Sequence, residues 1–594
     1  MIMLTRSRCA LRHVRQCALL MVAASLGLPA QAAEPSPLAP LAPEATVAYF
    51  ELTQPQALLT AALDERWKSL LEHNEKWQAF WKSEDAVRLK AGIGTIEDRL
   101  QMPWHQALGE LTGGGLAIAA DPFQRWSLLV VRAKNAEILA MVRRLAIDLG
   151  QLAELASGKP SPLQAGDHRG IEVWSVGGQA AYALVPDEKL LIAGNRREDV
   201  VAALDRLLDG GQSLAQRAEF QAAQAANRTG SGAWGWLNLE PLRNLSQWDK
   251  LQVATRVNPG AESLAGGVIE ALDRAPCLAL QAQASDDRLS LRWQVPFDRE
   301  QVSENRQWYF APAGQDATPA TLQPEGTILS VSIYRDHADM WRRRDQLFDE
   351  AARTQLTQAD TVLGLLFSNR DFGSQVLGEL QPGSRFVVAR QTFVDGAPVP
   401  AVKLPAFAAV LELKNPDRFS TSLVAAFQAL IGFVNVNAVQ TGKPTLLQQS
   451  AEYRGSTLYQ ASYLPPDEPS PAADLIYNFS PTCAVVKNHF IVASTTELAR
   501  QLIDELQREL SSRCTADNVR VVLNLEQLAA ILAENERTLV TQNMLEKGNT
   551  RAEAEGEIAM VLRVLRAMGN AQLRLTPTEG VLELETKLGL PKLP

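Results

Sequence analysis

Three short sequences occur twice in this chain and keep the same order. They are LGEL (108–111 and 377–380), Lys-Asn after an apolar run (134–135 and 414–415) and LNLE (237–240 and 523–526). Three longer segments also match between the two halves in the same order. Matches that recur in order are typical of a chain built from homologous units. The sequence therefore predicts a tandem duplication of a unit of about 280 residues.

The duplication and the local composition divide the chain into five predicted segments. They are a signal peptide (1–32), a Pro- and Ala-rich leader (33–44), a first repeat (45–300), a linker (301–324) and a second repeat (325–594). The second repeat carries two Pro-rich insertions, 394–405 and 463–474, which we expect on the surface. A specific function is expected at these insertions or where the repeats meet.

Each predicted repeat mixes short apolar runs with longer amphipathic ones. Runs such as 189–194 have the length and apolar content of strands, whereas 55–83 and 135–156 have helical periodicity. Very short connections, at 285–288 and 577–580, indicate antiparallel hairpins. We predict an α+β fold in which helices cover one face of an antiparallel sheet.

The N-terminus has the three parts of a secretory signal peptide. Four arginines precede an apolar run at 18–28, and Ala30-Gln31-Ala32 follows as a cleavage site. The run is shorter than the roughly 20 residues that span a bilayer, so cleavage is favoured over an uncleaved membrane anchor. We identify no later charge-free stretch of membrane length and expect no membrane span after cleavage. The mature protein is expected to be periplasmic or secreted.

The net charge argues against a nucleic-acid partner. Removing residues 1–32 takes away four arginines and no acid, so the formal charge of −9 becomes −13. Phosphate binding requires clustered lysines and arginines, whereas the densest basic sequence, WRRRD at 341–345, has acidic residues around it. We interpret it as a solvated helix face with local ion pairs.

Two stretches resemble a known group of proteins. They are SLAQRAEFQAAQAANRTGSGAWGWLNLEPL at 213–242 and ATVAYFEL at 45–52. This pattern resembles a large family of exported bacterial proteins that is classified only as a domain of unknown function. The resemblance implies an exported, duplicated α+β protein, and it supplies neither a substrate nor a site residue.

The histidines form no metal-binding or catalytic pattern. After cleavage five remain, and they share no H-x-x-x-H or H-E-x-x-H spacing: His73, His105, His168, His337 and His489. His105 stands beside Trp104 and just before LGEL, but the second repeat has no counterpart for it. Nucleophile elbows, phosphate-binding loops and dinucleotide fingerprints are also missing from the sequence. We therefore predict no catalytic residue, no metal ligand and no cofactor.

Three cysteines remain after cleavage: Cys277, Cys483 and Cys514. Cys277 and Cys483 lie in apolar strand-like runs and are interpreted as small buried thiols. A helix is expected between Cys483 and Cys514, and a helix of about fifteen residues is about 22 Å long. Because a disulfide requires Cα atoms within about 7 Å, we predict that these two cysteines are not bridged.

Acidic and aromatic residues were also considered as sites. Glu240 and Glu526 end the duplicated LNLE sequences, and we interpret both as capping residues of the helices that follow. Trp67, Trp77 and Trp81 share one helix face. A carbohydrate platform is conceivable there, but packing or an interface is favoured.

These observations favour a non-enzymatic function. We predict an exported binding or scaffold protein of the bacterial cell envelope, whose partner is an unidentified protein or envelope component. Two alternatives stay open: an envelope hydrolase whose site is assembled only in three dimensions, and a carrier of an apolar ligand.

Overall fold

The computed structural model describes most of the chain. The described residues are 38–53, 55, 75–158, 160–226, 232–285, 287–312, 315–393, 398–464, 474–508 and 514–590. The predicted signal peptide, Trp67, His73 and parts of both Pro-rich insertions lie outside the described residues.

The chain divides into two compact units. Unit 1 comprises residues 1–244, 275–295 and 590–594, and unit 2 comprises 245–274 and 296–589. Residues 245–274, which fall inside the first predicted repeat, thus pack with unit 2. A compact structural unit need not have the same boundaries as a duplicated segment, so the repeat boundaries stay a prediction.

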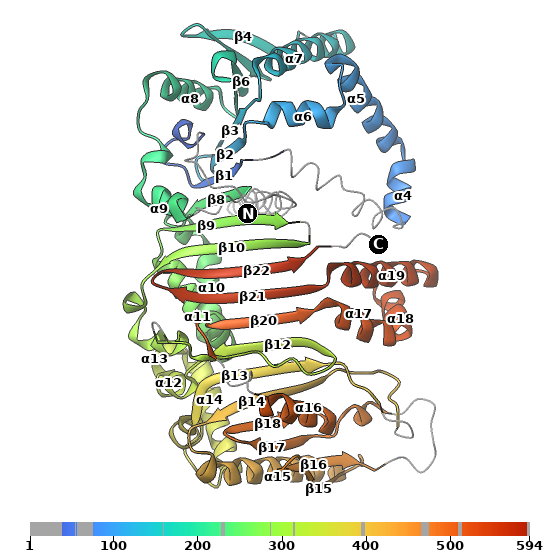
Figure 1. The fold of residues 1–594 in the computed structure, drawn as a ribbon. Helices are drawn as coiled ribbons and strands as arrows, with labels where there is room; N and C mark the ends of the chain where they lie inside the picture. The colour runs from blue at the N-terminus through green and yellow to red at the C-terminus, as the bar shows by residue number, and fades with distance from the viewer. Residues whose placement is uncertain are drawn as a thin grey trace. The chain divides into compact units, whose positions relative to one another are not determined.

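Unit 1 contains an antiparallel sheet. Its strands are β1 (Ala48–Leu52), β2 (Leu116–Asp121), β3 (Trp126–Arg132), β4 (Leu163–His168), β5 (Ile171–Val176), β6 (Ala180–Val185), β7 (Leu190–Gly194), β8 (Ala233–Asn238), β9 (Cys277–Ser285) and β10 (Arg288–Phe297). Its α-helices are α4 (Glu75–Lys82), α5 (Glu84–Leu100), α6 (Trp104–Thr112), α7 (Ala136–Ser157), α8 (Arg197–Asp209) and α9 (Ala218–Ala226). Short turns of helix are η1 (Ala39–Leu41), η2 (Pro186–Glu188), η3 (Leu214–Gln216) and η4 (Pro241–Asn244). The strands pair in the order β4-β5-β6-β7-β3-β2-β1-β8-β9-β10 (Figure 1).

Unit 2 contains a second antiparallel sheet. Its strands are β12 (Thr327–Tyr334), β13 (Leu380–Ala389), β14 (Ala406–Leu413), β15 (Leu446–Tyr453), β16 (Ser456–Tyr463), β17 (Thr482–Val486), β18 (His489–Ala493), β20 (Val519–Asn524), β21 (Asn570–Thr578) and β22 (Gly580–Gly589), with β11 (Thr318–Pro319) and β19 (Cys514–Thr515) forming a separate pair. Its α-helices are α10 (Ser246–Val257), α11 (Pro259–Arg274), α12 (His337–Arg342), α13 (Arg344–Leu347), α14 (Glu350–Leu366), α15 (Pro416–Gln440), α16 (Thr496–Gln507), α17 (Leu525–Glu534), α18 (Glu536–Lys547) and α19 (Arg551–Met568). Short turns are η5 (Arg299–Gln301), η6 (Glu304–Tyr309), η7 (Phe372–Val376), η8 (Leu377–Glu379) and η9 (Leu475–Asn478).

The two sheets share one strand order. In unit 2 the order is β15-β16-β17-β18-β14-β13-β12-β20-β21-β22 (Figure 1). When the two orders are compared place by place, each strand of unit 2 has a counterpart in unit 1. For example, β12 corresponds to β1 and β20 to β8. This agreement is what two copies of one fold would show, whereas their origin by duplication stays a prediction.

Helices pack on both faces of each sheet. In unit 2, α16 packs on the face that carries Val410 and Ile491, and α15 packs on the face that carries Phe490. In unit 1, α8 packs on the face of Ile192, and α7 on the face of Leu191. Successive residues of a strand point to opposite faces, so the two helices of each unit enclose the sheet between them. The α+β class is confirmed, and the prediction that helices cover one face is wrong.

Local sequence signals explain several elements. The short connections at 285–288 and 577–580 form the antiparallel hairpins β9–β10 and β21–β22, as predicted. Helix α7 starts after Asn135, whose side chain accepts a hydrogen bond from the Ile138 N–H. It ends at Gly158, which adopts a positive φ of 66°.

Candidate functional site

The duplicated sequences LGEL and Lys-Asn contact each other in each unit. In unit 1 the Asn135 amide donates to the Glu110 carboxylate at 3.3 Å, and Lys134 Nζ lies 2.8 Å from the same carboxylate. In unit 2 the Asn415 amide donates to the Glu379 carboxylate at 2.9 Å. In unit 1 these contacts join α6, which precedes β2, to the start of α7, which follows β3. In unit 2 they join η8, which precedes β13, to the start of α15, which follows β14. The repeated residues therefore serve packing, which explains why both halves contain them.

A second pair of contacts places His168. Its Nε2 lies 2.8 Å from Asp205 Oδ1 on α8, and this hydrogen bond is the largest cause that lowers the pKa of Asp205. In unit 2 the Tyr453 hydroxyl donates to Asp504 on α16 at 3.1 Å. Arg454 forms an ion pair with the same carboxylate at 2.9 Å. His168 thus joins a hairpin to a helix, as Tyr453 does in the other unit.

The other described histidines lie apart from one another. His105 is exposed, with its ring at 6.0 Å from the Trp104 ring. His337 begins α12, where burial lowers its pKa, and His489 is buried on β18. Among the described residues, no group of three or more His, Cys, Asp or Glu side chains could hold a metal ion.

His489 has the most perturbed environment of these histidines. Burial lowers its pKa to about 4, and the positive charge of Arg385 adds to this effect. The matched position of unit 1 is Leu190, since Arg132 pairs with Leu190 as Glu412 pairs with His489. A neutral side chain is thus accommodated at this place in both sheets.

This shift predicts an acid-sensitive contribution to the stability of unit 2. The unfolded chain takes up a proton on His489 below about pH 6.5, whereas the folded protein resists protonation down to about pH 4. The contribution of His489 is therefore constant above pH 6.5 and falls as the pH falls toward 4. Between these pH values the free energy of unfolding should therefore fall by about 2 kcal/mol less in His489→Leu than in the parent protein. Urea unfolding at pH 7.5 and pH 4.5 tests this, and identical pH dependence in both proteins would contradict it.

The cysteines, the described tryptophans of α4 and the basic sequence at 341–345 show no arrangement typical of a site. Cys277, Cys483 and Cys514 are all free thiols, and burial raises the pKa of Cys483 to about 12. The Trp77 and Trp81 rings lie 5.5 Å apart, edge to face, on α4. Ion pairs join Asp339 to Arg342 and Arg343, which agrees with the interpretation of 341–345.

In unit 2 the asparagine of LNLE caps the following helix, whereas in unit 1 it only closes a turn before η4. Asn238 Oδ1 accepts from the Glu240 N–H at 3.2 Å, and Asn524 Oδ1 accepts from the Gln527 N–H at 3.0 Å. Glu240 and Glu526 are exposed. The prediction that these glutamates cap the helices is therefore wrong. In unit 2 the shorter side chain of Asn524 stands at the N-cap of α17, from which it reaches the first free N–H groups.

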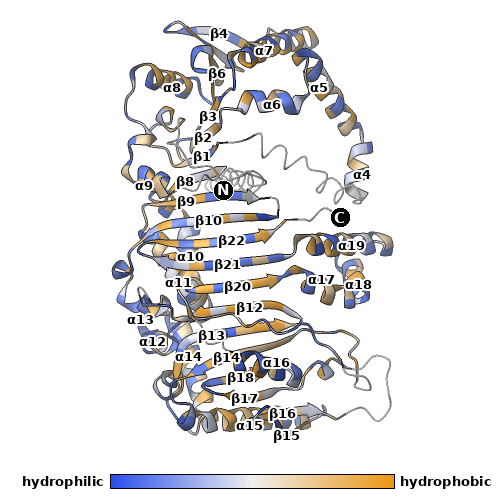
Figure 2. Ribbon diagram, in the orientation of Figure 1, coloured by the Kyte–Doolittle hydropathy of each residue, from blue (hydrophilic) through white to orange (hydrophobic). Residues whose placement is uncertain are grey.

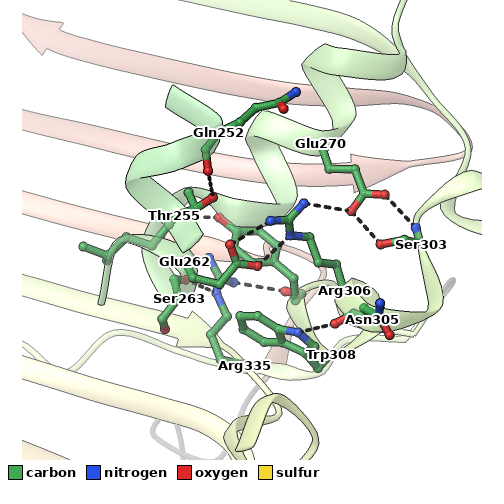
Figure 3. Close-up of polar contacts among 12 residues, drawn as sticks. Gln252, Thr255, Glu262, Ser263, Glu270, Ser303, Asn305, Arg306, Trp308 and Arg335 are labelled. Carbon is green, nitrogen blue, oxygen red and sulfur yellow. Dashed lines mark hydrogen bonds and ion pairs between the residues drawn. The ribbon is translucent and has the colours of Figure 1, made fainter. Parts of the chain in front are cut away.

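A buried charged cluster lies in unit 2 and was not predicted from the sequence. Figure 3 shows Arg306 of η6 between Glu262 and Glu270 of α11. Arg306 binds Glu262 through two hydrogen bonds of 2.6 and 2.9 Å, and lies 3.5 Å from Glu270. The Glu262 side chain is 0% exposed. Glu270 also accepts from the N–H and hydroxyl of Ser303, at 2.8 and 2.9 Å. We call Glu262, Glu270, Ser303 and Arg306 the anchor cluster.

Arg335 extends this polar region without a carboxylate. It is 1% exposed, and its guanidinium lies 3.4 Å from the centre of the Tyr309 ring. Its Nε donates to the Ser263 carbonyl on α11 at 2.6 Å (Figure 3). Burial lowers its pKa to about 10. Together with the anchor cluster, Arg335 fixes α11 against η6 and the end of β12. The arrangement holds these elements together and shows no exposed nucleophile.

Helix α15 presents the second unusual feature. It is the one helix among the described residues that length and composition would allow to cross a membrane, and 22% of its most apolar window is buried. No charged residue occurs between Phe419 and Gln440, and Figure 2 shows apolar colouring along much of α15. The statement that no later charge-free stretch reaches membrane length is therefore wrong.

One side of α15 is packed, and much of the remaining surface of the helix is exposed. The packed side includes Phe419, Leu423, Phe427 and Ile431, which join the core against β15, β17 and β18. The exposed side carries five large apolar residues: Leu430, Phe433, Val434, Val436 and Val439. We call these five residues the outer side of α15. Phe433 is 61% exposed and Val439 is 69% exposed.

Comparisons with known proteins add little to this description. No protein-family model matches the chain, and no curated protein matches it. Among solved structures, crystal forms I, IV and III of TP0453 match with TM-scores of 0.24, 0.22 and 0.22 and identities of 8%, 10% and 9%. These matches cover 46%, 44% and 46% of this chain, and 83%, 81% and 83% of that protein. A likeness at this level carries no argument about fold or function.

Proposed function

We propose that this chain is an exported protein of the bacterial cell envelope that acts by binding, and that the outer side of α15 is its binding surface. The observation that carries the proposal is the exposure of five large apolar side chains on one helix that has no charged residue between Phe419 and Gln440. Contiguous exposed apolar surface on a folded protein is typical of interaction sites. Residues 1–32 support export, because they have the basic, apolar and small-residue parts of a signal peptide.

The matched helix of unit 1 supports the assignment of function to α15. Helix α7 follows β3 as α15 follows β14, yet α7 contains Arg143, Arg144 and Asp148. Arg143 pairs with Glu172 at 2.9 Å, and Asp148 pairs with Arg99 of α5. The fold therefore accepts charges on a helix at this place. The lack of charged residues between Phe419 and Gln440 therefore supports a function for this helix beyond packing.

Site-specific photo-crosslinking in cells tests the binding surface. A benzophenone amino acid at Phe433 or Val436 is expected to give crosslinked products, because both positions are exposed on the outer side of α15. Leu155 of α7 is the matched control, since it is 82% exposed on the corresponding helix. A crosslinking yield at Phe433 and Val436 no higher than at Leu155 would contradict the proposal. Fusion of residues 1–32 to a reporter tests export separately.

A further inference from the structure

Resting on the proposed function, we propose that the outer side of α15 inserts into the interfacial region of a lipid bilayer, with the helix lying along the membrane surface. The argument uses the composition of the exposed side, the charges at the two ends of the helix and the packing of the opposite side.

The composition of the outer side favours lipid over a protein partner. Protein interfaces are enriched in Tyr, Trp and Arg, and a few such residues carry most of their binding energy. The outer side of α15 contains none of these and consists of valine, leucine and one phenylalanine. The exposed part of α15 also carries the amides Asn437 and Gln440 but no charge near its apolar residues. Uncharged amides beside apolar residues are compatible with the interfacial region of a bilayer.

Charges at the ends of α15 complement lipid headgroups. Arg418 is exposed in the first turn beside the exposed Asp417, and Lys443 is exposed just after the last turn. At 1.5 Å per residue, the 25 residues of α15 extend about 37 Å. Long cationic side chains at both ends of an apolar helix can reach phosphate groups at the membrane surface while the apolar residues lie deeper. The formal charge of the chain, −9, opposes attraction to strongly anionic lipid, so zwitterionic lipid should suffice.

The packed side of α15 favours a helix that lies in the surface over one that spans the bilayer. Phe419, Leu423 and Phe427 are buried in the core of unit 2. The Asn435 side chain both accepts from Leu446 N–H and donates to Leu446 carbonyl, at 2.7 and 2.9 Å, which ties the helix to β15. A spanning orientation would break these contacts. Insertion of the outer side alone leaves them intact.

Vesicle flotation of the protein without residues 1–32 tests the inference. The probe is a phosphatidylcholine vesicle, with a second preparation that contains phosphatidylglycerol. We expect the protein to float with both, and the double variant Phe433→Asp, Val436→Asp to lower the bound fraction about tenfold or more. The matched control Leu155→Asp on α7 should bind as the parent does. A Phe433→Trp variant should shift its fluorescence to shorter wavelength when vesicles are added.

Several outcomes would overturn the inference, and they differ from failure of the proposed function. Circular dichroism first confirms that each variant folds as the parent. Absence of vesicle binding, or equal loss in Leu155→Asp, overturns the lipid assignment. Self-association that Phe433→Asp abolishes, without vesicle binding, would assign the outer side of α15 to a second copy. Crosslinks from Phe433 to protein without vesicle binding would keep the binding surface and reject lipid as its occupant.

Discussion

Replacing Arg306 with methionine is expected to lower the free energy of unfolding of unit 2 by about 3–5 kcal/mol. The Glu262 side chain is 0% exposed and its two oxygens both accept from Arg306. Methionine has a similar length but no charge, so Glu262 would have to be buried without a cation. Breaking a buried ion pair costs more than the pair contributes, because the remaining charge has lost water and gained nothing. Urea unfolding at neutral pH measures the loss.

A double-mutant cycle separates this mechanism from loss of packing. Glu262→Gln removes the charge that Arg306→Met leaves uncompensated, so the double variant should recover more than half of the stability that Arg306→Met loses. Arg551→Met is the matched control, because Arg551 pairs with Glu555 on the exposed side of α19. Such an exposed pair is screened by solvent, so its loss should change the stability little. Additive effects of the two changes at Arg306 and Glu262 would show that the anchor cluster is not coupled.

Hydrogen exchange gives a local test of the same cluster. Arg306, Ser303 and Arg335 hold α11 through Glu262, Glu270 and a backbone carbonyl. Amide protection in α11 should therefore fall in Arg306→Met by more than protection in α19 does. Equal loss in both helices would indicate global destabilisation alone.

The features that the sequence predicts well depend on neighbouring residues. Hairpins at 285–288 and 577–580 follow from two short connections between alternating runs. The helix start at Asn135 follows from one side chain that reaches an N–H group three residues ahead. LGEL and Lys-Asn recur in the same order, which predicts matched positions in the two halves. Glu110 and Glu379 indeed make the same type of contact, each accepting from the asparagine of Lys-Asn. Each of these signals lies within a few residues or is visible by comparison of the halves.

The anchor cluster could not be predicted because its partners are distant in sequence. Glu262 and Arg306 are 44 positions apart and belong to separate elements. Glutamate and arginine are mostly exposed in folded proteins, so a solvated position is the ordinary expectation for each. The one local signal is Gly266-Gly267 inside the helical pattern of α11, since glycine is unfavourable in a helix unless a close approach requires it.

The two faces of each sheet and the apolar length of α15 were missed for different reasons. Periodicity shows that a helix is amphipathic, but it does not state on which face of a sheet the helix packs. The charge-free run between Phe419 and Gln440 is present in the sequence, but Asn, Gln, Ser and Thr interrupt its apolar residues. Exposure of its outer side is a tertiary property that only the structure supplies.

Gly267→Ala is expected to lower the free energy of unfolding of unit 2 by about 2–3 kcal/mol. A Cβ atom on Gly267 would lie 2.3 Å from Cδ1 of the Tyr309 ring. That ring cannot easily move, because its hydroxyl donates to the Leu264 carbonyl at 2.6 Å and Arg335 covers its face. Helix α11 would have to shift outward, which would also stretch the bonds between Arg306 and Glu262.

Gly556→Ala on α19 provides the control with the opposite sign. A Cβ atom there meets nothing within 4 Å, so the substitution should stabilise unit 2 by up to about 1 kcal/mol through helix propensity. The same change in two helices of one unit is thus expected to act in opposite directions, because Gly267 is buried against Tyr309 whereas Gly556 is exposed. Stabilisation by Gly267→Ala would show that α11 does not depend on close approach to η6, and the role given to the anchor cluster would then have to be abandoned.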